Sequence, residues 1–243
     1  MKNFNHVKLS ELDYELESVT TEKGRAYKTP GGKFYPSITT LLSYSTDKTF
    51  LEEWRNRIGE AEANKITKKS SDRGTKLHEM CEKYLLNELT DFKIRMMMPD
   101  IKDFFLQLRP HIDSNVGDVY GLEVPLYSDK LRLAGRTDCI AIWNNKLSVI
   151  DYKNSRKEKK EEWIKHYFIQ CTAYAVMFEE RTGIPIDQIV VAIANEEGTP
   201  QIFVREKSNY LLELQSYIER YWNDEQNTTI LASIANGGII KQQ

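Results

Sequence analysis

The chain has 243 residues, and its 34 Lys and Arg against 36 Asp and Glu give a formal net charge of −2. This length, with 40% hydrophobic and 29% charged residues, indicates a folded α/β or α+β domain and argues against wholesale disorder. The near-neutral charge excludes a globally basic nucleic-acid binder, so a polyanionic partner would have to be held by local basic patches.

The apolar segments are too short for a membrane protein, because none approaches the roughly 20 residues of a spanning helix. The stretch that follows Met1 is mixed and polar, without the apolar centre of a signal peptide or the Arg-rich character of a transit peptide. We therefore expect no signal, transit or transmembrane segment, no membrane partner and a cytoplasmic location.

The first half of the chain reads mostly as helix. Ser37 or Thr39 is a candidate N-cap, since a hydroxyl there can accept a bond from a free helical N–H. Apolar residues at helical spacing then predict helices over residues 47–66, 74–89 and 101–108.

Alternating strand patterns begin at Gly121. They predict strands over 121–127, 131–143 and 146–151, then a helix over 161–180, strands over 188–195 and 201–205, and a last helix over 211–221. This order predicts an α+β fold around a mixed sheet. With no repeat or linker, we expect one domain over 1–243, with a helical part over about 35–120 and an α/β core over about 121–225.

The cysteines are three, Cys81, Cys139 and Cys171, and no pair has C-x-x-C spacing. A disulfide framework, a structural zinc site and a four-cysteine iron–sulfur cluster all lack ligands. Each cysteine lies in an apolar pattern, so we expect buried free thiols.

Two carboxylates and a lysine form the first candidate site. Asp151 and Lys153 share one face of a strand, and the hairpin turn at 144–145 brings Asp138 beside them. Adjacent carboxylates repel unless a cation lies between them or one is protonated, and Mg²⁺ or Mn²⁺ favours such oxygen ligands. A lysine there can stabilise a developing oxyanion. Glu123, on the preceding strand, is a third acid within reach. A D-x-K segment at a solvated strand end is the alternative interpretation.

Three further groups can surround this site. His78 borders the apolar stripe of its helix, and Arg73, Thr75 and Lys76 precede it at an expected helix N-terminus, which suits an anion. Gln170 and Tyr174 share one helix face. The run from Lys153 to Lys165 is net basic and could follow a phosphate backbone. Core packing and solvated helix faces are the alternative interpretations of these residues.

In chain order, these residues resemble the RecB-type branch of the PD-(D/E)XK nuclease superfamily. The motifs that carry the resemblance are His78, Gly135-Arg136-Thr137-Asp138, Asp151-Tyr152-Lys153 and Gln170-Cys171-Thr172-Ala173-Tyr174. The sequence is most similar to the mitochondrial genome maintenance exonuclease family, over about residues 35–222. That similarity adds the segments Pro36-Ser37-Ile38-Thr39-Thr40, Arg73-Gly74-Thr75-Lys76-Leu77-His78 and Val190-Val191-Ala192.

The resemblance implies a restriction-endonuclease-like core, with helices flanking a central mixed sheet, and an N-terminal helical arch through which a free strand end threads. It implies a metal-dependent exonuclease, using Mg²⁺ or Mn²⁺, that hydrolyses single-stranded DNA or flaps from a free end in DNA replication, repair or recombination. The implied metal ligands are His78, Asp138, Asp151 and the Tyr152 carbonyl, and the implied catalytic residues are Asp138, Asp151 and Lys153. The implied supporting or DNA-binding residues are Arg73, Thr75, Lys76, Gln170 and Tyr174, and Glu123 is an additional acid.

We expect a monomer from the cytoplasm of a bacterium or a phage-infected cell, without the iron–sulfur cluster that some RecB-type relatives carry. Three alternatives stay open. One is an endonuclease of the same fold that cuts duplex or branched DNA. The second is a nuclease-like DNA-binding module without catalytic activity, and the third is a helicase-associated recombination subunit.

Overall fold

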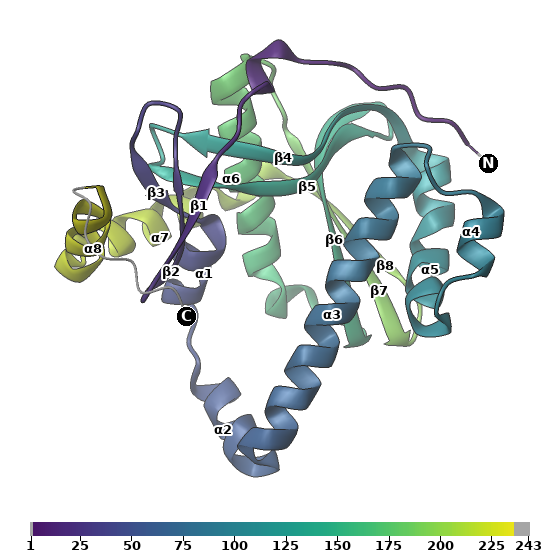
Figure 1. Cartoon of the computed structure of the whole chain (residues 1–243), viewed down its shortest axis with the longest axis horizontal. Helices are drawn as coiled ribbons and strands as arrows, with labels where there is room; N and C mark the ends of the chain where they lie inside the picture. The colour runs from purple at the N-terminus through teal and green to yellow at the C-terminus, as the bar shows by residue number, and fades with distance from the viewer. Residues whose placement is uncertain (1, 236–243) are drawn as a thin grey trace.

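In the computed structural model, which describes residues 2–235, five strands form one mixed sheet in the order β4-β5-β6-β7-β8 (Figure 1). They are β4 (Val116–Ser128), β5 (Leu133–Trp143), β6 (Lys146–Lys157), β7 (Gln188–Glu197) and β8 (Gln201–Glu206). β6 and β7 run parallel, and the other neighbours run antiparallel. The predicted α+β fold with a mixed sheet is confirmed. The predicted boundary at residue 121 is wrong, because it falls inside β4.

Helices cover both faces of this sheet. α6 (Lys165–Thr182) lies on one face with α1 (Ile38–Ser45) and α7 (Leu211–Asn223), and α3 (Glu60–Leu85) and α5 (Pro99–Asn115) lie on the other. Successive strand residues point to opposite faces, so Val149 packs with Phe168 of α6 whereas Ile150 packs with Phe105 of α5. The remaining helices are α2 (Thr49–Ile58), α4 (Asp91–Arg95) and α8 (Glu225–Ala235), with short 3₁₀ turns at Ser10–Leu12, Glu161–Trp163 and Lys207–Tyr210.

The helices expected over 47–66 and 74–89 are divided differently. α2 ends at Ile58 and is capped by Gly59, whose φ of 86° favours glycine. α3 then runs without a break for 26 residues. The polar segment 67–73, between the two predicted helices, is therefore helical as well. Its lysines and serines form a helix without an apolar face, and Gly74 is retained within it because α3 passes close to β6. A Cβ at Gly74 would lie 3.0 Å from the side-chain oxygen of Asn154.

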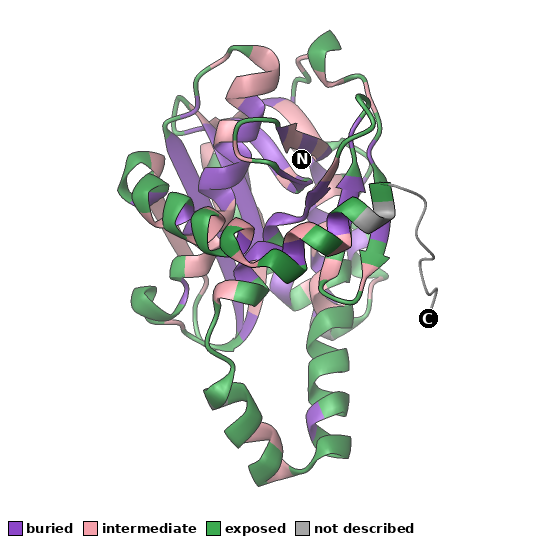
Figure 2. Ribbon diagram, turned by 90° about the vertical axis from the view of Figure 1, so that its left-hand side faces the viewer, coloured by how far each residue is buried: buried purple, intermediate pink, exposed green. Residues whose placement is uncertain are grey.

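α2 and the first turns of α3 project from the body as a two-helix arm (Figure 1). Figure 2 shows that most of this arm is exposed. Within it, Ala63 is buried, because Ala63 lies at the junction of the two helices. The side chain of Asn154 donates a hydrogen bond of 3.3 Å to the Ser70 carbonyl. The arm thus emerges from the body next to the C-terminal half of β6.

A small antiparallel sheet precedes the helices and was not predicted. It consists of β1 (Glu17–Thr21), β2 (Gly24–Lys28) and β3 (Phe34–Pro36). These strands have only three to five residues and few buried side chains, so their alternation is weak. Ser37 follows directly, and its side chain accepts a bond from the N–H of Thr40. Of the two candidate N-caps, Ser37 is confirmed, and Thr39 lies within α1.

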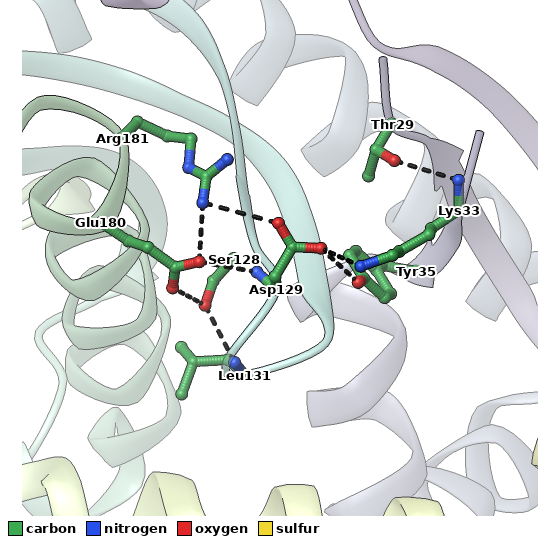
Figure 3. Close-up of polar contacts among 8 residues, drawn as sticks. All are labelled: Thr29, Lys33, Tyr35, Ser128, Asp129, Leu131, Glu180 and Arg181. Carbon is green, nitrogen blue, oxygen red and sulfur yellow. Dashed lines mark hydrogen bonds and ion pairs between the residues drawn. The ribbon is translucent and has the colours of Figure 1, made fainter. Parts of the chain in front are cut away.

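A polar cluster ties this small sheet to the main one (Figure 3). Asp129, in the turn after β4, accepts hydrogen bonds from Lys33 at 2.8 Å and from the Tyr35 hydroxyl at 2.7 Å. Its other oxygen lies 3.6 Å from Arg181 of α6, which also pairs with Glu180. The hydrogen bond from Lys33 is the main reason that the pKa of Asp129 is lowered. The cluster therefore fixes β3, the β4–β5 turn and α6 against one another.

Two other predicted helices have longer or later bounds. The helix expected over 101–108 is α5, which runs from Pro99 to Asn115. The helix expected from 161 begins at Lys165, after a 3₁₀ turn. Among residues 2–235, no helix is long and apolar enough to cross a membrane.

Candidate metal and nuclease site

Asp138 and Asp151 lie on neighbouring antiparallel strands, next to the register pair Cys139–Ile150. The side chain of Asp151 is buried, and Lys153 donates to its Oδ1 at 2.7 Å. Asp138 accepts a 2.9 Å bond from the backbone N–H of Tyr152. The strand pairing predicted from the sequence therefore brings two carboxylates and an ammonium to one place between α3 and α6.

His78 joins them from α3. Its Nε2 lies 2.6 Å from the carbonyl oxygen of Tyr152, and its Nδ1 lies 3.4 Å from Oδ1 of Asp138. A carbonyl can only accept, so Nε2 carries a proton and Nδ1 faces the carboxylate. Burial disfavours the charged ring, but Asp138 outweighs it and the pKa of His78 is raised. The imidazole is thereby held in one orientation by a backbone carbonyl, as is common for metal-bound histidines.

Glu123 reaches the same place through an unusual backbone conformation. Its φ of 49° lies in the left-handed region, where a residue other than glycine pays roughly 1–2 kcal/mol. The strand curls tightly here, since a Cβ on Gly121 would lie 2.2 Å from the Val124 side chain. Arg136 donates a 2.6 Å bond to the Glu123 carbonyl. This local strain directs the Glu123 carboxylate towards Asp138.

His78, Glu123 and Asp138 each offer one ligand atom, and the three atoms lie within 4.8 Å of one another. Burial, with Asp138 nearby, raises the pKa of Glu123 to about 7. Burial likewise raises the pKa of Asp151 to about 6, although Lys153 opposes the rise. Such crowding of carboxylates favours the capture of a cation. These three residues form a candidate divalent metal site.

Asp151 already has a positive partner in Lys153. The Lys153 Nζ atom lies 2.7 Å from Oδ1 and 2.6 Å from Oδ2 of the buried carboxylate. A divalent ion would therefore be held first by His78, Glu123 and Asp138. A donor set of carboxylate oxygens and one imidazole suits Mn²⁺ well. The carboxylates of this set also suit Mg²⁺. The residues present therefore fit a divalent cation.

The ligand set inferred from the resemblance differs in part from this group. Asp151 lies outside the three-residue group, whereas Glu123 belongs to it. The Tyr152 carbonyl accepts its bond from His78. In this arrangement, the Tyr152 carbonyl orients an imidazole ligand.

Tyr167 was not predicted as a site residue. The ammonium of Lys153 lies 5.1 Å from the centroid of its ring, a cation–π geometry. The His166 ring lies 4.2 Å from that of Tyr167, and burial, with nearby lysines, lowers the pKa of His166. Tyr167 precedes Gln170 by three residues on the same helix face. That spacing could have identified it.

Gln170 and Tyr174 lie on α6, as predicted. Tyr174 is buried, and a Cβ on Gly135 would come within 2.8 Å of its ring. Burial raises the pKa of Tyr174, and the carboxylates of Asp138 and Asp151 add to that rise. Tyr174 thus packs on β5 and lies near the two carboxylates. Gln170 lies beside the Tyr174 hydroxyl.

The expected anion pocket at Arg73, Thr75 and Lys76 is not formed as predicted. α3 begins at Glu60, so the N–H groups of these residues bond within the helix and cannot bind an anion. Arg73 pairs with Glu196 at 3.0 Å, and the Thr75 hydroxyl donates to the Ser71 carbonyl. Lys76 is exposed and faces away from the carboxylates. The helix continues because Gly74 is tolerated in its interior.

Ion pairs occupy much of the basic run 153–165. Arg156 and Lys157 both pair with Glu197, at 2.9 and 3.8 Å, and Lys165 pairs with Glu213 at 2.5 Å. A phosphate backbone would have to compete with these carboxylates. The run therefore offers less free charge than its sequence suggests.

Comparison with known proteins finds one matching family and several curated relatives. The family described as "PD-(D/E)XK nuclease superfamily" matches residues 44–239. Mitochondrial genome maintenance exonuclease 1 from Homo sapiens is 26% identical over 208 residues, covering 77% of this chain and 59% of that protein. The Xenopus tropicalis protein of that name is also 26% identical, covering 79% and 57%. The chain thus spans less than two thirds of these relatives.

A solved structure of a candidate exonuclease from Eubacterium rectale is 15% identical to the chain. The superposition covers 69% of this chain and 69% of that chain, with a TM-score of 0.43.

Proposed function

The chain belongs to the PD-(D/E)XK nuclease superfamily, and from this premise we propose that it is a metal-dependent DNA exonuclease. Its substrates are single strands or flaps, which it hydrolyses from a free end during DNA replication, repair or recombination. The observation that carries this proposal is the meeting of Asp138, Asp151 and Lys153 on adjacent strands, with His78 and Glu123 beside them.

In this proposal, Asp138, His78 and Glu123 would hold Mg²⁺ or Mn²⁺, and Asp151, which is ion-paired with Lys153, would be a further carboxylate ligand. A divalent ion bound there supplies Lewis-acid stabilisation of the phosphate and a water of lowered pKa. The family resemblance assigns the Tyr152 carbonyl to the metal as well.

Lys153 has a separate role in the proposal. Burial disfavours its ammonium, but Asp151 and Asp138 outweigh this and raise its pKa. It therefore stays charged and can donate to the phosphate oxygen on which negative charge develops. Tyr167 holds the ammonium in place from the side of α6.

Two features support an action on strand ends. The relatives named above are exonucleases by name, and the chain carries an exposed two-helix arm that starts beside the site at Ser70 and Asn154. We assign this arm, α2 with the first turns of α3, to the arch expected from the resemblance. A single strand would pass between the arm and the body before it reaches Asp138.

End-labelled single-stranded, duplex and flap DNA, with Mg²⁺, Mn²⁺ or EDTA, tests the proposal, and a circular single strand tests the need for an end. We expect the linear strand and the flap to be shortened progressively with either metal, the circle to stay intact, and EDTA to stop cleavage. Asp138→Asn should be inactive, whereas Asp103→Asn, at an exposed position of α5, should match the wild type.

Cleavage of the circle would instead indicate an endonuclease of the same fold. Binding of DNA without metal-dependent turnover would indicate an inactive binding module. Activity of Asp138→Asn equal to that of Asp103→Asn would refute the site itself.

A further inference from the structure

The face of α3 away from the carboxylates carries a groove of about 320 Å³. We call it the outer groove, and its members are Lys65, Lys68, Lys69 and Lys76 of α3, with Met98 and Ile101 at the start of α5. The four lysines are exposed, and Met98 is 66% exposed, whereas Ile101 is buried. The groove is thus a row of ammonium groups beside a small apolar floor.

The outer groove is separate from the candidate metal site. Gly74 faces β6, and a helix turns by about 100° for each residue, so Lys65 and Lys76 lie about 180° and about 200° around α3 from Gly74. His78, on the same measure, lies only about 40° from Gly74. A ligand in the groove would therefore have the thickness of α3 between itself and the carboxylates.

The charge of the groove is not neutralised by the protein. Among residues 2–235, no carboxylate forms an ion pair with Lys68, Lys69 or Lys76, and Lys65 has only a 3.9 Å contact with Glu62. Asp72 and Arg73 also line the groove, and Arg73 is engaged by Glu196. The groove thus has a surplus of positive charge on a chain whose net charge is −2.

The spacing of the lysines fits a phosphate backbone. From Lys65 to Lys76 the helix rises by about 16 Å, and a strand of duplex DNA carries one phosphate for about every 3.4 Å along its axis. The row therefore spans about four or five phosphates. Sequence-independent binding of single strands relies on aromatic rings for base stacking, and the described residues that line the groove include none.

We infer that the outer groove binds the phosphate backbone of double-stranded DNA. It holds the duplex arm of a flapped or tailed substrate, while the single strand that leaves this duplex enters the site on the other side of α3. This inference rests on the proposed function for the strand that is cut. The groove itself supplies affinity through phosphates alone.

The variant Lys68→Gln/Lys69→Gln tests the inference. Both lysines lie on the outer side of the arm, about 120° and about 140° around α3 from Gly74, so the strand that passes between the arm and the body does not meet them. Its matched control is Lys28→Gln/Lys130→Gln, which removes two exposed lysines that do not line the groove. Fluorescence anisotropy in EDTA measures the affinity for a blunt duplex, a tailed duplex and the free tail at several salt concentrations. Cleavage of the free tail and of the tailed duplex with Mn²⁺ is measured in parallel.

We expect the groove variant to bind both duplexes more weakly and to lower the slope of log affinity against log salt by up to about two, since each lost phosphate contact removes about one. KM for the tailed duplex should rise, while cleavage of the free tail should match that of the control. Unchanged duplex affinity and slope would overturn the inference, and so would an equal loss of free-tail cleavage.

Failure of the proposed function has a different signature. In that case the wild type would not cut the free tail, whatever the state of the groove lysines. Lysine-dependent binding of polyglutamate as tight as that of the duplex would indicate an acidic protein partner and would also overturn the inference.

Discussion

The Glu123 carboxylate should destabilise the metal-free protein, and Glu123→Gln should relieve this cost. Burial and the Asp138 carboxylate raise the pKa of Glu123 from its ordinary 4.5 to about 7. The folded state therefore holds this proton more tightly than the unfolded chain does. The protonated carboxyl stabilises the folded state relative to the ionised form. This contribution is complete below pH 4.5 and is lost as the pH rises through 7.

The magnitude follows from this rise in pKa. At 1.36 kcal/mol for each pH unit, a carboxyl moved from 4.5 to about 7 changes the free energy of unfolding by about 3.4 kcal/mol. Glu123 is partly exposed, and solvent screening reduces the change to about 1–2 kcal/mol. Glutamine keeps the size of the side chain and removes its charge.

Urea unfolding in EDTA measures the effect. Above pH 7, Glu123→Gln should unfold at higher urea than the wild type, by about 1–2 kcal/mol, and near pH 4.5 the two should coincide. Added Mn²⁺ should stabilise the wild type more than the variant, because a ligand stabilises the state that binds it. The matched control is Glu22→Gln, at an exposed turn position, which should show neither effect.

The reasoning would be refuted by a variant that is no more stable than the wild type above pH 7 in EDTA. An equal gain of stability from Mn²⁺ in the variant and the wild type would remove Glu123 from the metal site. The two results are independent of each other, so the cost of burying the Glu123 carboxylate and its ligand role are tested separately.

Lys153→Met should keep the apolar stem of the lysine and lose about 10²–10³ in kcat, measured on single-stranded DNA at saturating Mn²⁺; an unchanged kcat would exclude Lys153 from transition-state stabilisation. Tyr167→Leu should lower kcat by about 2–10-fold through the lost cation–π contact, whereas Tyr167→Phe should restore it, and equal kcat values for the two variants would refute a role for the ring. Gly135→Ala would place a methyl group 2.8 Å from the ring of Tyr174 and should lower the free energy of unfolding by about 1–3 kcal/mol. Gly31→Ala, whose Cβ would have no neighbour closer than 3.9 Å, is its neutral control in urea unfolding.

The strands of the main sheet could be predicted because their environment is periodic. β5 and β6 bury alternate residues in the two cores, and the turn at 144–145 joins them, so the proximity of Asp138 and Asp151 followed from the pattern. Lys153 shares a face with Asp151 by the two-residue period. The contact between these two side chains is a direct consequence of local geometry.

The remaining site features depend on tertiary contacts that no local pattern records. Glu123 reaches Asp138 through a left-handed residue in a curled strand, which a sequence of alternating residues does not indicate. The close approach of Gly74 in α3 to Asn154 of β6 joins residues far apart in the sequence. The anion pocket expected before His78 was lost for the same reason, because a continuous helix has no free N–H groups there.

The segregation of charge explains how a nearly neutral chain could act on DNA. Glu123, Asp138 and Asp151 lie where a phosphate must approach, so without a cation the site would repel its substrate. The lysines of the outer groove lie across α3 from these carboxylates and need no metal to attract phosphate. If both proposals hold, DNA binding divides into a duplex part, which persists in EDTA and weakens with salt, and a single-strand part, which requires the metal. Neutrality on average is thus compatible with two oppositely charged regions on the two sides of α3, the strand carboxylates and the lysines of the outer groove.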